Sequence, residues 1–112
     1  MKIYHNPRCS KSRQTLNIIQ EKGESVEIIE YLKSVPTEKE LEEIINVLGI
    51  KPVQLLRKGE ADFKDNFKGK TLTDKEWIKA MVKYPKLIER PIVVKGNKAV
   101  LGRPPENVLE LL

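Results

Sequence analysis

The residues best suited to chemistry lie near the start of the chain, in the run His5-Asn6-Pro7-Arg8-Cys9-Ser10-Lys11-Ser12-Arg13. Cys9 is the only cysteine of the protein. Lys2-Ile3-Tyr4 before it predicts a short strand, and the apolar spacing after it predicts a helix to about Gly23. Cys9 is therefore expected at the turn from a strand into the first turn of a helix. Unpaired backbone N–H groups and the helix dipole favour a thiolate at such a place.

Positive charge gathers around this cysteine, because Arg8, Lys11, Arg13 and His5 are all close in sequence. A nucleophilic sulfur that faces an anion fits this pattern. A lone cysteine is also common as a small buried apolar residue. The polar and charged neighbours of Cys9 are unusual for a core position, so we predict a reactive thiol.

Three residues near Cys9 could tune its thiolate, and each has a structural alternative. His5 could act on the thiolate or could pack and hydrogen-bond at the strand end. Asn6 and Ser12 could donate hydrogen bonds to the sulfur, but both residue types are also common helix caps. His5 is the only histidine, with no second cysteine to help it bind a metal, so we predict no metal site.

Length and composition predict one domain over residues 1–112. No apolar run is long enough to cross a bilayer and no signal peptide is indicated, so no membrane contact is expected. A single cysteine allows no internal disulfide, which favours a cytoplasmic location. The net charge of +5 could indicate nucleic acid, but the lysines alternate with glutamates and aromatic residues are only 5%. We therefore expect a small anionic substrate and no direct nucleic-acid binding.

The order of the predicted strands and helices indicates the fold that contains the cysteine. A β-branched segment at 26–30 predicts a second strand, parallel to the first through a right-handed crossover. Helices are expected from Thr37 to Gly49, over 52–58, and from Thr73 to about Pro85, while 59–69 stays open between loop and helix. Strands at 92–94 and 99–101 predict a hairpin, and a final helix follows with Val108, Leu109, Leu111 and Leu112 on or near its apolar face. The order βαβ, helical insert at about 37–85, then ββα predicts an α/β fold of thioredoxin type, with a mixed four-stranded sheet flanked by helices.

Several motifs resemble those of one family, in the same order and at similar spacing. They are His-Asn-Pro-x-Cys-x-x-Ser-Arg after Ile-Tyr, Leu55-Leu56-Arg57-Lys58, Glu89-Arg90-Pro91-Ile92-Val93-Val94 and Gly102-Arg103-Pro104-Pro105-Glu106. Together they resemble the glutaredoxin-coupled arsenate reductases, which have a thioredoxin-like fold. The resemblance implies that Cys9 is catalytic and that Arg57, Arg90 and Arg103 hold the oxyanion. It also implies a cis bond before Pro91, where the sequence by itself would allow trans.

Three arginines make chemical sense beside such a thiol. Guanidinium groups stay charged and offer fixed pairs of donors to oxyanion oxygens, and the same charges lower the pKa of a nearby thiol. Taken singly, each arginine could instead be a surface residue or half of a salt bridge.

The function predicted from the resemblance is a monothiol arsenate reductase or a close relative. Arsenate or a similar oxyanion would be the substrate, no cofactor would stay bound, and glutathione or another small thiol with glutaredoxin would resolve the adduct. One alternative is an Spx-like transcription regulator that binds RNA polymerase, although the usual second cysteine of its Cys-x-x-Cys switch is Ser12 here. Another alternative is a glutathione-dependent thiol transferase.

Overall fold

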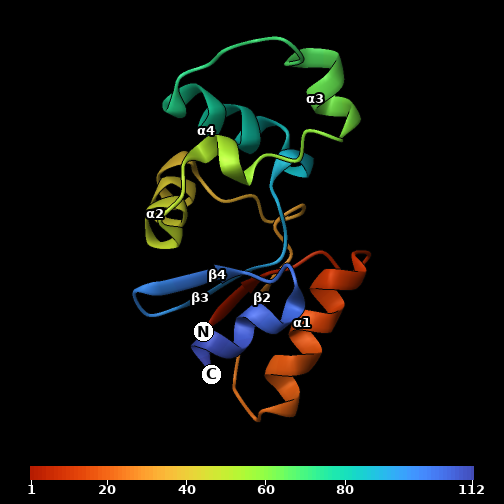
Figure 1. Cartoon of the computed structure of the whole chain (residues 1–112), viewed down its shortest axis with the longest axis vertical. Helices are drawn as coiled ribbons and strands as arrows, with labels where there is room; N and C mark the ends of the chain where they lie inside the picture. Colours follow the sequence, from red (N-terminus) through yellow and green to blue (C-terminus); the bar gives the residue numbers. More distant parts are fainter. The chain divides into compact units, whose positions relative to one another are not determined.

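The structure is a computed structural model that describes residues 1–112. Its contacts divide the chain into two compact units, residues 1–34 with 90–112 and residues 35–89. The first unit contains a sheet, and the second is helical (Figure 1). None of the helices combines the length and the apolar character needed to span a membrane.

The sheet of the first unit has four strands in the order β2-β1-β3-β4. β1 (Lys2–Tyr4) is parallel to β2 (Glu27–Ile29), and α1 (Ser10–Glu21) forms the crossover between them. β1 is antiparallel to β3 (Ile92–Lys95), which forms a hairpin with β4 (Lys98–Leu101). The mixed α/β sheet of thioredoxin type predicted from the sequence is therefore confirmed.

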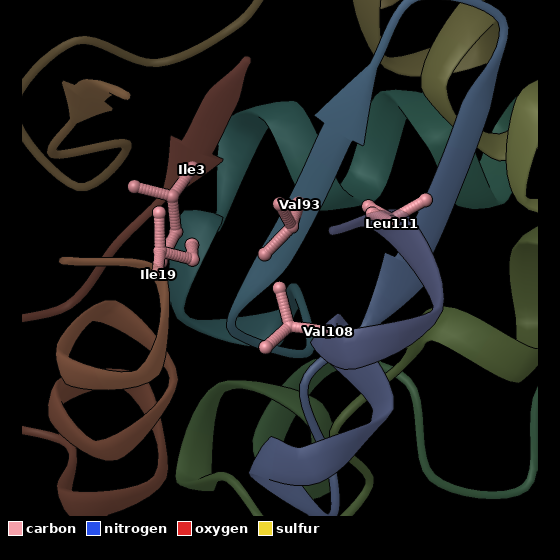
Figure 2. Close-up of a cluster of buried hydrophobic side chains, with 5 residues drawn as sticks. All are labelled: Ile3, Ile19, Val93, Val108 and Leu111. Atoms are coloured by element: carbon pink, nitrogen blue, oxygen red, sulfur yellow. The ribbon is translucent and has the colours of Figure 1, made fainter. Parts of the chain in front are cut away.

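A small apolar core covers one face of this sheet. Ile3 on β1 and Val93 on β3 are cross-strand partners, and both side chains are fully buried. Ile19 of α1 and two residues of the last helix, Val108 and Leu111, pack against them (Figure 2). Each such aliphatic side chain contributes about 1.5–3 kcal/mol when it is fully buried. The core thus fixes α1 and the last helix against the strands.

The last helix, η3 (Pro105–Leu111), differs from the expectation in its type. It is a 3₁₀ helix, and it buries Pro105, Val108 and Leu111, which are three residues apart. Side chains at i and i+3 lie one above the other in a 3₁₀ helix, so this spacing puts all three on the sheet side. Leu109 is 45% exposed, so its predicted place on the apolar face was wrong.

The helical unit contains α2 (Glu38–Leu48), η1 (Pro52–Leu55), α3 (Ala61–Asn66), α4 (Asp74–Lys83) and η2 (Pro85–Leu87). Both predicted capping boxes are present at the starts of α2 and α4. The segment left open between loop and helix contains α3. This short helix buries no residue completely and contacts α4 through aromatic rings.

Two expected elements are shorter than predicted. The second strand has three residues in place of five, and the helix expected over 52–58 ends at Leu55. After Leu55 the chain becomes extended, because Leu56 forms an isolated antiparallel bridge with Ile88. This long-range pairing competes with the continuation of the helix.

A close contact joins the end of β4 to α1 and to the start of β3. The Gly102 N–H donates to the Pro91 carbonyl at 2.9 Å. Thr15 Oγ1, which is fully buried on α1, donates to the Lys11 carbonyl at 2.8 Å and lies 3.3 Å from the Gly102 carbonyl oxygen. A β-carbon on Gly102 would collide with the Thr15 side chain and would lie 2.7 Å from Pro91 Cγ. Only glycine fits this position without displacement of its neighbours.

Gly102→Ala is therefore expected to lower the free energy of unfolding by about 1–3 kcal/mol, because the added methyl group overpacks a buried contact. Urea unfolding followed by circular dichroism would measure the change. Gly59→Ala is a matched control, since a β-carbon there meets no atom within 4 Å and the residue has no positive φ. Equal stabilities of the Gly102 and Gly59 variants would contradict this account.

Candidate active site

Three segments that carry predicted site residues leave the sheet at the same edge. Tyr4 on β1 pairs with Ile92 on β3, and Ile92 pairs with Leu101 on β4. These three residues form one row across the sheet. The segments that continue past this row carry Cys9, Arg90 and Arg103. Sheet register therefore brings together residues that are up to 94 positions apart.

Cys9 is the N-cap residue of α1, which confirms the predicted place at the turn from a strand into a helix. Its backbone is extended, with φ −92° and ψ 122°, and its carbonyl accepts the first hydrogen bond of the helix from the Arg13 N–H at 3.0 Å. The first turn of α1 contains no acidic residue, so no carboxylate competes for the positive end of the helix dipole. The side chain is partly exposed, which leaves the sulfur accessible to a small reactant.

The pKa of the Cys9 thiol lies below its ordinary value, as the net result of opposing effects. Burial, the largest single effect, raises the pKa because it disfavours the charged thiolate. The backbone N–H of Ser12, the Arg90 side chain, the backbone N–H of Lys11 and the Arg103 side chain all lower it, and together they outweigh burial. Cys9 forms no conventional side-chain cap on α1, yet the N–H groups of the first turn still stabilise its thiolate.

Arg103 connects the thiol with the start of β3. Its Nη1 atom lies 3.8 Å from Cys9 Sγ and donates to the Arg90 carbonyl at 3.1 Å. Arg90 and Arg103 each precede a cis proline, Pro91 and Pro104. The cis state of the Arg90–Pro91 bond agrees with the family resemblance, whereas the cis bond before Pro104 was not predicted.

A buried hydrogen-bond network shapes the loop before Cys9. The Ser12 hydroxyl lies 2.6 Å from His5 Nδ1 and accepts from the Asn6 N–H at 3.1 Å. The Asn6 carbonyl accepts from the Cys9 N–H at 3.0 Å, and Asn6 Oδ1 accepts from the Arg8 N–H at 3.0 Å. His5, Asn6 and Ser12 are all buried, so their hydrogen bonds hold the loop from its protein side. The Ser12 backbone also lowers the thiol pKa, whereas direct tuning of the thiol by His5 and Asn6 stays a prediction.

His5 does not supply the positive charge that the sequence suggested. Burial lowers the pKa of His5, Glu30 raises it to a smaller extent, and Arg13 lowers it further. The net shift is downward from an ordinary value near 6.5, so the ring is mostly neutral at pH 7. The fixed charge at the thiol therefore comes from guanidinium groups.

Arg57 belongs to the helical unit, where two carboxylates bind it. Its Nη1 donates to Glu89 Oε1 at 2.7 Å and its Nε donates to Glu60 Oε1 at 3.2 Å. Burial acts to lower the pKa of Arg57, but the two carboxylates raise it further than burial lowers it. Its backbone N–H also donates to the Leu87 carbonyl at 2.8 Å. The part of Arg57 in oxyanion binding stays a prediction.

Sequence reasoning missed four residues that support these arginines. Glu60 lies three residues after Arg57, across the turn before α3, so its nearness in the sequence is the only signal that could have found it. Glu89 is 32 positions away and has no local signal. Thr15 and Gly102 likewise meet across 87 positions, although a glycine directly before Arg103 marks a place of close approach. No group of three or more His, Cys, Asp or Glu side chains is arranged to hold a metal ion.

The fold and this site define a thioredoxin-like protein with an activated cysteine thiol. The model of the ArsC family matches residues 4–111. The chain is 46% identical to an arsenate reductase of Haemophilus influenzae, over 98% of this chain and 97% of that protein. It is also 46% identical to the uncharacterized protein YfgD of Escherichia coli, over 100% of this chain and 96% of the relative. The solved structure of an arsenate reductase from Vibrio cholerae matches with a TM-score of 0.93 and 44% identity, over 100% of this chain and 98% of that one. The chain belongs to the ArsC family.

The opposing effects on the Cys9 thiol lead to a direct test. The pH dependence of alkylation by iodoacetamide, a neutral reagent, should give a thiol pKa below the ordinary value of about 8.5. Arg103→Met should raise the pKa, because it removes a guanidinium 3.8 Å from the sulfur while burial continues to oppose ionisation. Arg8→Met is the matched control, since the Arg8 side chain has no hydrogen bond to the sulfur, and it should shift the pKa less. A wild-type pKa at or above the ordinary value would contradict the account.

Proposed function

We propose that this protein reduces arsenate to arsenite, with Cys9 as the nucleophile and an external thiol system as the source of electrons. The observation that carries the proposal is the partly exposed Cys9 thiol, with a lowered pKa, beside the Arg103 guanidinium. Membership of the ArsC family over nearly the whole chain, and relatives named as arsenate reductases, support arsenate as the oxyanion.

Arg90 and Arg103 are suited to hold the oxyanion beside the sulfur. Arsenate near neutral pH is an anion with several acceptor oxygens, and a guanidinium offers it a planar pair of donors. The same two groups lower the thiol pKa, so substrate binding and activation of the nucleophile depend on one cluster. The resemblance adds Arg57 to this cluster, where Glu60 and Glu89 would hold its guanidinium in one orientation.

The proposed reaction begins when the Cys9 thiolate attacks arsenic. A sulfur–arsenic bond forms, an arsenic–oxygen bond breaks, and the oxygen leaves as water after it takes up a proton. A small thiolate such as glutathione then attacks the Cys9 sulfur. The sulfur–arsenic bond breaks and its electron pair stays on arsenic, which leaves as arsenite. Glutaredoxin would reduce the resulting mixed disulfide and restore the Cys9 thiol.

The need for an external thiol follows from the residues themselves. Cys9 is the only cysteine, so no internal disulfide can form. Ser12, where a Cys-x-x-Cys motif would have its second sulfur, is fully buried and bound to His5. A reducing cytoplasm, which supplies glutathione and glutaredoxin, is the compartment in which this scheme would operate.

We expect sustained arsenite formation from arsenate when glutathione and glutaredoxin are both present. Without any thiol, the reaction should stop after at most one adduct per chain, which mass spectrometry of the intact protein would detect. Cys9→Ser should abolish both the adduct and the turnover. Turnover in the absence of thiols, or in the Cys9 variant, would refute the proposal.

Substitution of each of the three arginines by lysine tests the oxyanion site. Arg57→Lys, Arg90→Lys and Arg103→Lys keep a charge but lose the planar pair of donors. We expect each change to lower kcat/KM for arsenate at least about tenfold, which corresponds to roughly 1.4 kcal/mol of transition-state stabilisation. Steady-state kinetics at saturating glutathione and glutaredoxin would measure it.

Arg8→Lys is the control for this series, because it makes the same chemical change directly beside Cys9 without loss of a contact to the sulfur. Its kcat/KM should stay close to that of the wild type. If Arg57→Lys alone behaved like this control, Arg57 would be excluded from the oxyanion site. If all three arginine variants did, the proposed binding cluster would be wrong.

A further inference from the structure

A pocket of about 360 Å³ opens on the helical unit, where the chain passes from α3 to α4. Phe67 and Tyr84 supply half-buried aromatic surface in it, and Lys70, Lys79 and Lys83 bring three positive charges. All of these residues lie within residues 35–89. None of them takes part in the arsenate chemistry proposed above.

The three lysines of this pocket have no carboxylate partner. The ion pairs of the chain use other cations, such as Lys33, Lys95 and Arg57. Lys79 and Lys83 are also four residues apart on α4, so their like charges repel each other. Lys83 gains from its place in the last turn of α4, near the negative end of the dipole. The charges of Lys70 and Lys79 have no comparable structural use.

Glu76, the only acidic residue that lines the pocket, caps the start of α4. The Glu76 carboxylate accepts from the Thr73 N–H at 2.9 Å as part of the capping box of α4. The backbone and side chain of Thr73 lower the pKa of Glu76, which keeps the cap ionised. Three lysines and one glutamate line the pocket, so its net charge is positive. The Glu76 carboxylate is hydrogen-bonded to the start of α4, so it does not pair with the lysines.

The aromatic surface of the pocket is fixed by ring contacts. Phe67 packs on Trp77 with ring centroids 5.8 Å apart, and its ring meets the Tyr84 ring edge-on at 5.7 Å. Lys83 Nζ lies 5.6 Å from the centre of the Tyr84 ring. One face of this ring is thus covered by a cation, which opposes stacking of a nucleic-acid base. An aliphatic side chain needs no open ring face and can rest against both rings.

We propose that this pocket docks an acidic segment of a partner protein. Carboxylates of the segment would pair with Lys70, Lys79 and Lys83, and one apolar side chain would rest on Phe67 and Tyr84. Lys79 and Lys83 are one helical turn apart, about 6 Å along the axis. Acidic residues at i and i+4 of a helix, or at i and i+2 of an extended strand, have a matching spacing. Charge complementarity and this spacing define the partner.

The test uses the full-length protein and two synthetic octapeptides with blocked ends. One contains four glutamates at alternate positions, one leucine and three serines, and the other replaces each glutamate by glutamine. Trp77 is the only tryptophan and contacts Phe67, so its fluorescence reports on the pocket. We expect the acidic peptide to bind with a dissociation constant of about 1 mM or tighter at low salt. The glutamine peptide should bind at least tenfold more weakly.

A charge-reversal pair separates this pocket from the overall positive charge. Lys79→Glu with Lys83→Glu should weaken binding of the acidic peptide at least tenfold. Lys39→Glu with Lys51→Glu produces the same net charge, +1 in place of +5, and should change binding less than twofold. Equal losses in the two double variants, no binding by the wild type, or tighter binding of an oligothymidylate than of the peptide would each overturn the proposal.

Both double variants should keep the thermal unfolding midpoint within a few degrees, as well as wild-type alkylation of Cys9 by iodoacetamide. They should also retain adduct formation with arsenate, which involves no partner protein. These measurements make failure of the docking proposal distinguishable from failure of the arsenate reductase proposal. A variant pair that loses peptide binding but keeps the Cys9 chemistry supports a separate docking surface.

Discussion

The geometry at the thiol depends on one close contact, the packing of Gly102 against Thr15 and Pro91. β4 ends one residue earlier, and because Gly102 has no side chain, its backbone can lie directly against Thr15 of α1. The Thr15 hydroxyl and the Pro91 carbonyl then hold the Gly102 backbone from two sides. Arg103 is the next residue, so its backbone is held close to α1. Its guanidinium Nη1 lies 3.8 Å from Cys9 Sγ. A fold that placed a larger residue at this point would have to move Arg103 away from the sulfur.

The thiol itself illustrates a balance between access and activation. Burial around Cys9 acts against the thiolate, so the site needs donors that outweigh it. Two come from the backbone of the first turn of α1, and two come from arginines on the other half of the chain. The backbone donors exist whenever α1 forms, whereas the arginines arrive only when the β3–β4 hairpin is paired with β1. Full activation of the thiol is thus a property of the completed sheet and not of the local segment.

The difference between local and long-range contacts also explains how much could be predicted from the sequence. The order of the strands, the two capping boxes and the place of Cys9 between a strand and a helix start have signals within about four residues, and they were predicted correctly, although the second strand is shorter than predicted. The type of the last helix and the early end of η1 depend on distant packing, and they were not. The ion pair of Arg57 with Glu89 and the contact of Thr15 with Gly102 lie beyond local pattern, because their partners are 32 and 87 positions away. Family motifs identified the arginines, but they carried no information about which groups hold them.

The charge that activates Cys9 is almost independent of pH, and this separates the protein from thiol enzymes that use a histidine base. Guanidinium groups remain protonated throughout the physiological range. His5 is held neutral at pH 7 by burial and is linked to the first turn of α1 through Ser12. Burial lowers the pKa of His5, so acidification would charge His5 only below its ordinary pKa, where the added proton must enter a buried hydrogen-bond network. At pH values above the pKa of His5, Cys9 is the only residue beside the sulfur site that changes charge as the pH rises through the thiol pKa. The pH dependence of its reactivity in this range should therefore follow the ionisation of a single group.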